Sequence, residues 1–348
     1  MHFAGRRFGT ERHAHFQTEE VRVGGGRLVL AAGNDRLQSH LRLAHIAERL
    51  DGRCARLSPG FRRRVACRRF CGTAPVPCLH QTASFYVRDL HAGRSADQLI
   101  QGRYFDRNAP LRGEFHKLFG SLFGDYTKHL SVIEALSATH YGLSSEQLLS
   151  KTRLHSGGGF TDVLSELLES GFITFLPQFG NKKKAGIYLL TDEFTLFYLK
   201  WVRRWENELT GLEGYWQRQS NTQSFRAWAG YAFETLCIKN IQHIKQQLGI
   251  AAVTTHVSQW HNESTQIDLV IDRADNCINL CEIKFHNAAY TLTAEEAAKL
   301  QRKKAAFLTS TQTRKALFLT LITVNGVTRN PNYVNTIDCH VQAEAFVG

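Results

Sequence analysis

The sequence lacks any long uninterrupted apolar run, although 43% of its 348 residues are hydrophobic. A helix that spans a bilayer needs about 18 or more consecutive apolar residues, so we expect no membrane span and no membrane partner. A secretory signal is also missing, because Arg6 and Arg7 are not followed by an apolar stretch. We therefore expect a soluble, cytoplasmic protein whose length allows two domains, or two domains with a small extension.

The chain does not have the cysteine pattern of a small disulfide-bonded scaffold. Four of its eight cysteines lie between Cys54 and Cys78, whereas such scaffolds distribute paired cysteines over a short secreted chain. A zinc module built from Cys67, Cys71 and Cys78 with Cys54 or His80 is the alternative. Structural zinc sites usually present two tight ligand pairs, and no second tight pair follows Cys67 and Cys71. The spacing therefore argues against a zinc module.

Lysine is absent from residues 1–90, where 16 Arg and 7 acidic residues account for +9 of the total net charge of +12. The other 27 basic and 24 acidic residues contribute only +3. The overall basicity thus says little about the rest of the chain, where DNA binding needs a local basic patch. We interpret residues 1–90 as an irregular Arg- and Cys-rich segment that is either disordered or translated out of frame.

A nucleotide-binding P-loop is missing as well. The motif Gly-x4-Gly-Lys-Ser/Thr occurs nowhere in the chain. The glycine clusters at 24–26 and 157–159 lack the Lys and the hydroxyl group that meet nucleotide phosphates and Mg²⁺. We therefore expect this chain alone neither to bind nor to hydrolyse ATP.

The sequence predicts two short apolar strands near the carboxyl terminus, and each contains charged residues. Asp268 lies in the stretch 266–273, and Glu282 and Lys284 lie at the end of the stretch 278–285. Side chains two apart on a strand share a face, so Glu282 and Lys284 point the same way and a neighbouring strand can bring Asp268 beside them. Carboxylates suit Mg²⁺ or Mn²⁺, and an ammonium group offsets phosphate charge. The pattern therefore indicates phosphodiester hydrolysis.

This arrangement resembles the PD-(D/E)xK nucleases, which have the restriction-endonuclease-like fold. The resemblance implies that Asp268 and Glu282 bind the metal and that Lys284 serves the attacking water. It also implies that Glu234, on a preceding helix, is an auxiliary ligand or a base. Ile267 stands where that family usually has Pro. The plainer alternative is that Glu234 is a surface charge and that Lys284 only pairs with Glu282.

Four strings in the second part of the chain carry a longer resemblance, namely residues 192–198, 224–234, 266–268 and 281–285. With them, a stretch of about residues 92–348 is similar to the carboxyl-terminal half of a prokaryotic AAA+ ATPase family. In that family a P-loop ATPase module precedes a winged helix and a nuclease-like domain. The resemblance implies a truncated or frame-shifted ATPase, in which residues 91–125 are the remaining helical tail of the ATPase module.

Residues 126–200 are predicted to form a winged helix-turn-helix, followed by a linker helix over 201–223. Ser144 is a plausible N-cap because Gln147 follows three residues later, which is the capping-box pattern. The predicted elements are helices at 126–137, from Ser144 onward and at 160–170, and strands at 172–176 and 187–190.

The wing turn between those strands contains Lys182, Lys183 and Lys184. In DNA-binding winged helices such basic residues meet phosphate while the third helix enters the major groove. The third helix here carries acids, including Glu166, on its outward face. Carboxylates repel the negatively charged phosphates of DNA. We therefore keep two alternatives of equal weight, DNA contact through the wing lysines and packing between domains.

Residues 224–348 are predicted to form an α/β nuclease-like domain in which helices flank both faces of a mixed sheet. Its predicted elements are helices at 224–247 and 293–308, and strands at 251–257, around Asp268, around Glu282, at 316–323 and at 337–341.

Two functions compete at this point. The first is an enzyme, a Mg²⁺-dependent DNA endonuclease. The second is a non-catalytic DNA-binding or docking fragment of an ATPase whose nucleotide hydrolysis takes place in a missing domain. The partners that these hypotheses imply are DNA, a separate ATPase module and a second copy of the chain. The residues of the first hypothesis are Asp268, Glu282, Lys284 and Glu234.

Overall fold

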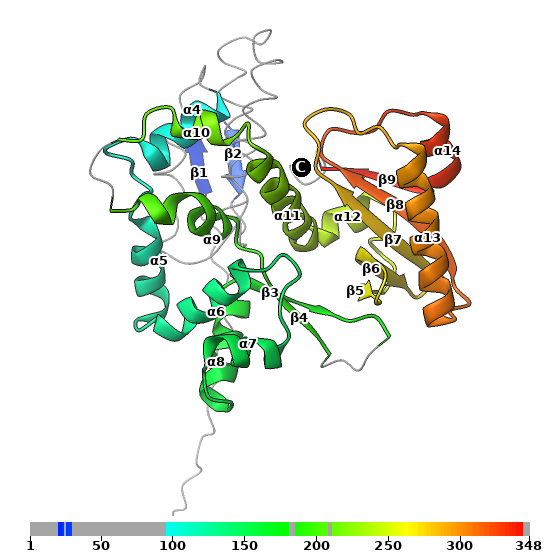
Figure 1. Cartoon of the computed structure of the whole chain (residues 1–348), viewed down its shortest axis with the longest axis horizontal. Coiled ribbons are helices and arrows are strands. Elements are labelled where there is room, and N and C mark those ends of the chain that lie inside the picture. Colours follow the sequence, from blue (N-terminus) through cyan, green and yellow to red (C-terminus); the bar gives the residue numbers. More distant parts are fainter. Residues whose placement is uncertain (1–19, 24–25, 30–94, 181–184, 208–210, 344–348) are drawn as a thin grey trace, which may run out of the picture. The chain divides into compact units, whose positions relative to one another are not determined.

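The computed structural model describes residues 20–23, 26–29, 95–180, 185–207 and 211–343 (Figure 1). The chain divides into two compact units, residues 1–36 with 59–89 and residues 37–58 with 90–348. The described part of the first unit is an antiparallel hairpin of β1 (Glu20–Val23) and β2 (Gly26–Val29). The other predictions for residues 1–90, including the zinc alternative, lie outside the described residues.

Aromatic side chains form the core of the helices that open the second unit. Phe105 stacks on Trp216 with ring centroids 5.9 Å apart, and Phe115 stacks on Tyr198 at 4.2 Å. All four are buried. The linker helix predicted over 201–223 is instead divided among shorter elements. The helices here are α4 (Ala96–Ile100), η1 (Gln101–Phe105), α5 (Glu114–Phe123), α9 (Glu193–Phe197), η2 (Tyr198–Val202), η3 (Arg203–Trp205) and α10 (Tyr215–Gln219).

Three helices and a hairpin follow in the order that the winged-helix prediction requires, and the arrangement is compatible with that fold. The capping box is present, since Ser144 Oγ accepts from the Gln147 amide and Gln147 Oε1 accepts from the Ser144 amide. The wing lysines Lys182, Lys183 and Lys184 lie outside the described residues. The elements are α6 (Thr127–Ser137), α7 (Ser145–Thr152), α8 (Gly158–Glu169) and antiparallel β3 (Ile173–Pro177) and β4 (Gly186–Leu190).

One acid that we expected on the outward face of the third helix has a structural role. Glu166 of α8 lies 2.6 Å from Nε2 of the buried His129 of α6. The imidazole ring also stacks on Phe123. The contact joins the first and third helices of the predicted winged helix. The Glu166 carboxylate therefore has a partner within the protein, although the sequence indicated a free acid on the outward face.

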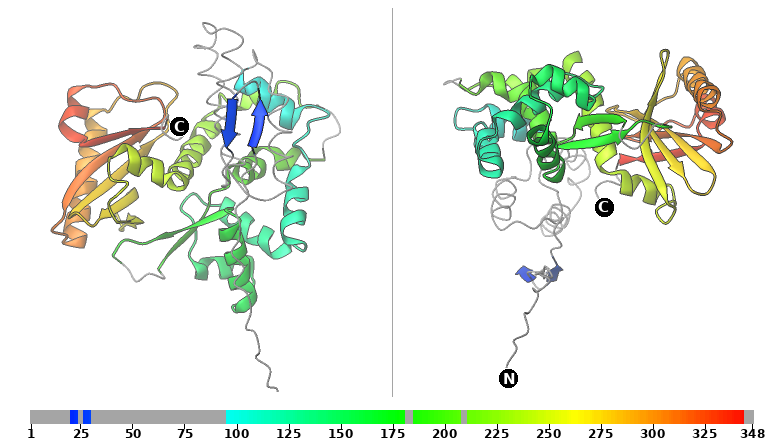
Figure 2. Two further views of the ribbon diagram at one scale, coloured as in Figure 1. Left: turned by 180° about the vertical axis from the view of Figure 1, so that it is seen from behind. Right: turned by 90° about the horizontal axis from the view of Figure 1, so that it is seen from below.

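The remaining residues confirm the predicted mixed α/β fold, a five-stranded sheet in the order β5-β6-β7-β8-β9 with helices on both faces. The pairs β5–β6 and β6–β7 are antiparallel, and β7–β8 and β8–β9 are parallel. α11 and α12 cover one face, and α13 and α14 the other (Figures 1 and 2). The elements are α11 (Gln223–Lys239), α12 (Ile241–Gln247), β5 (Thr255–His261), β6 (Gln266–Arg273), β7 (Cys277–Lys284), α13 (Ala294–Thr311), β8 (Ala316–Thr323), α14 (Pro331–Thr336) and β9 (Cys339–Gln342).

Two boundaries and one helix differ from the sequence prediction. The first strand, expected at 251–257, begins four residues later, at Thr255, and continues to His261. The helix expected over 224–247 breaks at Asn240, whose side-chain amide donates to the Leu236 carbonyl at 2.8 Å and satisfies an end of α11. α14 was not predicted.

The hairpin β3–β4 is attached to the edge of the five-stranded sheet. Gln178 pairs in parallel with Gln259, and the Phe179 amide donates to the Gln259 carbonyl at 2.8 Å. Leu176 and Leu189 of the hairpin share a hydrophobic cluster with β6, β7 and α11. The hairpin thereby forms one wall of the second of the two cavities described below. Among the described helices, none combines the length and the apolar character that crossing a bilayer requires.

Candidate active site

α11 supplies Glu234 to the site. Phe233 and Cys237, its neighbours on the helix, are buried in the cluster that also contains Leu269 and Cys281 of the sheet. Because these contacts hold one face of α11 against the sheet, Glu234 lies half-buried at the edge of that contact. Its side chain lines a cavity together with those of Asp268, Glu282 and Lys284. The structure therefore brings together the four residues that the sequence pointed to.

A β-bulge places Asp268. Where β5 pairs with β6 the register shifts by one residue, so that Asp268 and Leu269 together face Gln259. Ile267 and Val270 pack in one hydrophobic cluster although they are three residues apart, which simple alternation along a strand does not allow. An extra residue of this kind bends the strand and re-aims a side chain. Here the re-aimed side chain is the carboxylate.

The ladder between β6 and β7 ends beside this bulge. Its last paired residues are Leu269 and Cys281. One step further on, Oδ2 of Asp268 accepts a hydrogen bond from the Ile283 amide at 2.9 Å. The carboxylate thus takes the place of a strand carbonyl and satisfies a backbone donor that the open ladder leaves free. This bond fixes Asp268 next to the strand that carries Glu282 and Lys284.

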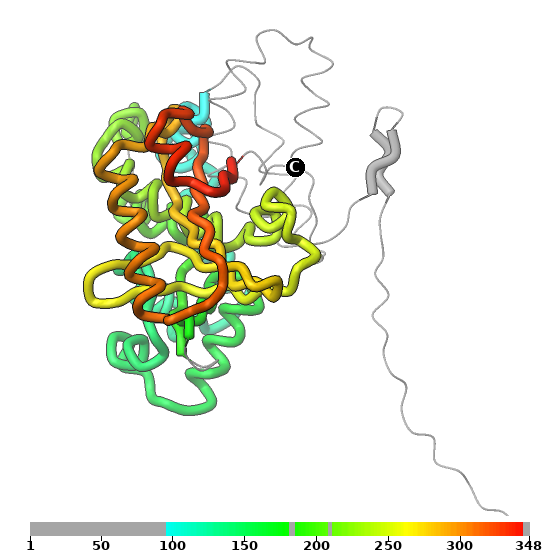
Figure 3. The backbone as a smooth tube through the Cα atoms, turned by 90° about the vertical axis from the view of Figure 1, so that its right-hand side faces the viewer, coloured from blue at the N-terminus to red at the C-terminus, as the bar shows by residue number. Residues whose placement is uncertain are grey.

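Two ammonium groups hold the buried carboxylate of Glu282. Lys284 Nζ lies 2.8 Å from Oε1, and Lys303 Nζ donates to Oε2 at 2.6 Å. Glu282 and Lys303 are only 7% and 8% exposed. Lys284 lies on the same face of β7 as Glu282, as its spacing predicts. Lys303 belongs to α13, the helix that packs against the sheet (Figure 3).

Lys303 is the residue that sequence reasoning missed. In the sequence it stands in a group with Lys299, Arg302 and Lys304, a pattern that indicates a solvated helix face or one that follows a DNA backbone, whereas Lys303 is buried. Its position contains a usable signal, because it falls three residues after Leu300 and four before Phe307, both buried. A lysine on the apolar stripe of a helix requires a buried anion, and Glu282 is that anion.

The lysines and Glu282 stabilise one another's charged forms. Burial by itself raises the pKa of Glu282, but Lys284 and Lys303 together outweigh it and hold this pKa below its usual range. Burial by itself lowers the pKa of Lys284, and the nearby Glu282 carboxylate reverses this, so the pKa of Lys284 is raised. Lys284 therefore stays protonated and acts as a hydrogen-bond donor rather than as a base.

Asp268 and Glu234 are in the opposite situation. Burial, followed by repulsion from Asp268 and Glu282, raises the pKa of Glu234 to about 8. Burial, followed by repulsion from Glu282, raises the pKa of Asp268 to about 6. In the part of the chain that the structure describes, neither carboxylate has a salt-bridge partner. These two acids are therefore the ones that a further cation would relieve.

The donor set fits Mg²⁺ or Mn²⁺ in the way small hard cations usually bind. Over the described ranges, no three His, Cys, Asp or Glu side chains are arranged to hold one ion. Mg²⁺ commonly takes only one or two protein carboxylates and keeps waters and substrate phosphate as its other ligands. Asp268 and Glu234 meet that requirement. The prediction that Glu282 is a ligand stays a prediction, and its oxygens already accept from two lysines.

The cavity of about 500 Å³ around these side chains has a basic rim. Arg226 of α11 and Lys299 of α13 line it from opposite helices, in addition to Lys284 and Lys303. Four cationic side chains around three acids suit a polyanion whose phosphate approaches the acids. Arg226 and Lys299 are exposed, so both can contact a partner.

Residues 198–300 match a sequence family, DUF234, that is described as archaeal and bacterial proteins of unknown function. The matched stretch contains Glu234, Asp268, Glu282 and Lys284, and it ends before Lys303. No curated protein matches the chain.

The Lys303–Glu282 contact predicts a stability loss that depends on burial. Lys303→Met leaves Glu282 with one of its two cations, and we expect the free energy of unfolding to fall by about 3 kcal/mol, as for other broken buried pairs. Lys304→Met is the matched control, because Lys304 lies next in α13 and forms a 3.6 Å pair at a more exposed site. Its expected cost is below about 1 kcal/mol. Equal losses in urea unfolding would show that Glu282 does not need Lys303.

The raised pKa of Glu234 predicts a pH-dependent effect in metal-free protein. Between its ordinary value of 4.5 and about 8, the folded state binds this proton more tightly than the unfolded state does. The free energy of unfolding therefore falls as pH rises through this window. We expect Glu234→Gln to remove part of this fall, so the variant gains stability over the wild type at pH 8 and gains little at pH 5.

Thermal unfolding in a chelator at both pH values measures this effect. Glu263→Gln, at an exposed position in the β5–β6 turn, is the control and is expected to change the difference little. A Glu234→Gln variant whose stability follows the wild type at both pH values contradicts the electrostatic description of the site.

Proposed function

We propose that this protein hydrolyses phosphodiester bonds in nucleic acid with the help of Mg²⁺ or Mn²⁺. The observation that carries the proposal is the meeting of Asp268, Glu234 and the Lys284–Glu282–Lys303 group at one cavity. The resemblance to PD-(D/E)xK nucleases, and through it to the nuclease-like half of AAA+ ATPases, points to the same chemistry. DNA is the proposed substrate.

Each side chain then has a definite task. Asp268 is pinned through Oδ2 to the Ile283 amide, and its Oδ1 has no hydrogen bond within the described residues, so Oδ1 is the atom available for the metal. Glu234 faces the same cavity and serves as second ligand or takes the proton of the attacking water. When bound, Mg²⁺ would neutralise phosphate charge and make the water more acidic.

The lysines act on the phosphate side. Lys284 is protonated and one-third exposed, so its ammonium group can donate to a phosphate oxygen while it stays paired with Glu282. Lys303 is buried and holds the second oxygen of Glu282, so it positions the carboxylate rather than touching substrate. Negative charge that develops on the phosphate is thereby stabilised by a donor already in place.

A second function, binding or docking without cleavage, is favoured by one feature of the same site. Both oxygens of Glu282 accept from lysines. A site that neutralises its own carboxylate in this way can persist as a structural group after catalysis is lost. This second hypothesis describes a non-catalytic fragment of an ATPase that binds DNA or docks on another module.

A nicking assay decides between the two functions. The full chain is incubated with Mg²⁺ or Mn²⁺ and either supercoiled plasmid or single-stranded DNA, and we expect Asp268→Asn and Lys284→Met to lower the cleavage rate by about 10²–10⁴-fold, the range for removal of one catalytic group. Asp272→Asn is the matched control, because Asp272 lies on the same strand and pairs with Lys315 away from the cavity.

Equal nicking by the wild type and the Asp268 and Lys284 variants would rule out catalysis at this site. A salt-sensitive gel shift that survives chelation, in protein that does not nick, would support the binding function instead.

A further inference from the structure

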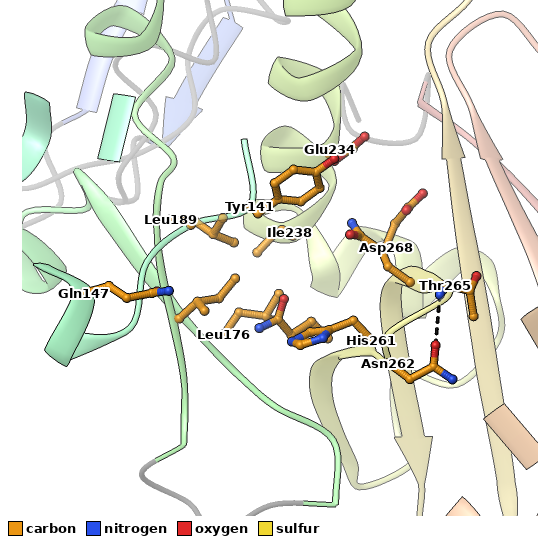
Figure 4. A pocket seen from close by; sticks show the side chains of 14 residues that line it. Tyr141, Gln147, Leu176, Leu189, Glu234, Ile238, His261, Asn262, Thr265 and Asp268 are labelled. Atoms are coloured by element: carbon orange, nitrogen blue, oxygen red, sulfur yellow. Dashed lines mark hydrogen bonds between the residues drawn. The ribbon is translucent and has the colours of Figure 1, made fainter. Parts of the chain in front are cut away.

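A second cavity adjoins the proposed catalytic one and is walled by the hairpin β3–β4 and the residue 141–147 segment. Its volume is about 530 Å³, within the range of cavities that take small organic groups. The two cavities meet at the acids Glu234 and Asp268, and Tyr141, Thr265 and Gln266 also line both. Figure 4 shows Tyr141 beside Glu234 at one edge, with His261 and Asn262 along the opposite edge.

The two cavities differ sharply in charge. The first is lined by Arg226, Lys284, Lys299 and Lys303. The second has no Lys or Arg in its lining, which consists of amide, hydroxyl, imidazole, aromatic and aliphatic side chains beside the two shared acids. A nucleotide also consists of a charged part and an uncharged part, namely the phosphate and a base that stacks and forms hydrogen bonds. The cation-free cavity therefore matches the base when the basic cavity holds the phosphate.

Tyr141 is an exposed aromatic on a segment that is held in place. Its side chain is 69% exposed, and its ring contacts no other aromatic ring among the described residues. Next to it, Gly142 has φ +68°, and a Cβ there would lie 2.6 Å from the Tyr188 carbonyl oxygen. Leu143 then exchanges backbone hydrogen bonds with Tyr188 at 3.0 and 2.8 Å. Because the backbone beside Tyr141 is fixed, stacking of a base orders only the tyrosine side chain and not the segment that carries it.

Amide side chains supply the polar contacts that a base edge needs. The side-chain amides of Gln259 and Gln266 line the cavity, and neither side chain forms a hydrogen bond within the described part of the chain. Asn262 Oδ1 is occupied by the turn it caps at Ser264 and Thr265, which leaves its NH₂ group as a donor. Such amides offer a donor and an acceptor together and pair with exposed base edges.

We propose that this second cavity binds an unpaired nucleobase next to the phosphate that is hydrolysed, with Tyr141 as the stacking surface. The substrate is then single-stranded nucleic acid or a duplex with an unpaired end, because a base inside a duplex has both faces stacked and its pairing edge occupied. Hydrolysis of that phosphate rests on the function proposed above. The binding itself requires no cleavage.

A binding experiment in a chelator separates the two proposals. The probe is a single-stranded DNA of about 12 nucleotides, a length within the common range of ~4–16 for single-strand sites, with one fluorescent 2-aminopurine base. For the full chain we expect quenching of the probe on binding. Tyr141→Ala is expected to weaken affinity about tenfold or more, as loss of one stacked base does elsewhere. Tyr141→Phe is expected to stay within about twofold of the wild type, because it keeps the ring.

Three controls sharpen the result. Val334→Ala removes a comparably exposed apolar side chain from α14, outside the cavity lining, and is expected to leave affinity unchanged. An unlabelled strand of the same length made of abasic residues, used as a competitor of the probe, is expected to bind the wild type and Tyr141→Ala equally. A fully paired duplex of the same sequence is expected to bind equally to both proteins. The same probe in RNA form shows which sugar the site prefers.

The outcomes are distinct. Equal affinity of the wild type and Tyr141→Ala for the single strand, or no binding of any probe, overturns the base-binding proposal. Tyr141-dependent binding by protein that cleaves nothing with Mg²⁺ or Mn²⁺ supports base binding and rejects hydrolysis. Cleavage of duplex DNA that Tyr141→Ala does not alter supports hydrolysis and rejects base binding.

Discussion

The buried Glu282 carboxylate, held between two lysines, is the interaction on which the rest of the site depends. An isolated charge at that depth would cost several kcal/mol, so the two ammonium groups are a condition for the fold as well as for function. Lys284 comes from the same strand and Lys303 from α13, so the contact also ties a flanking helix to the end of the sheet. This group fixes the position of the Lys284 ammonium, which the proposed function assigns to a phosphate oxygen.

Asp268 and Glu234 differ from Glu282, because within the described residues neither carboxylate is paired with a lysine. The β6–β7 ladder opens just before Asp268, and the carboxylate binds the backbone donor that the opening exposes. The bulge at Asp268 places its carboxylate in the cavity that Glu234 lines from α11. Burial and mutual repulsion then raise the pKa of both acids. The fold thus concentrates negative charge at one point and positive charge around it, which is the arrangement that a metal ion and a phosphate require together.

The features that could be predicted from sequence depend on local periodicity. The shared face of Glu282 and Lys284 follows from the two-residue repeat of a strand, and the capping box at Ser144 follows from a three-residue spacing. Lys303 was missed because three other basic residues surround it in α13, and that group has the appearance of a solvated face. The bulge at Asp268 has no residue signature, since it arises from how β5 and β6 pair. The shift of β5 to Thr255–His261 has a related cause, because the polar residues after Val257 give no clear strand signal until their pairing with β6 is known.

The central claim is that Asp268 is the anchor of a divalent cation in this cavity. The direct measurement is anomalous diffraction at the manganese edge from crystals of the full chain soaked in Mn²⁺, beside crystals of an Asp268→Asn variant. The account predicts an anomalous peak within bonding distance of the Asp268 carboxylate in the wild type, with the two lysine contacts to Glu282 still present, and no peak in the variant. A wild-type cavity without such a peak, or a peak that persists in the variant, would contradict it.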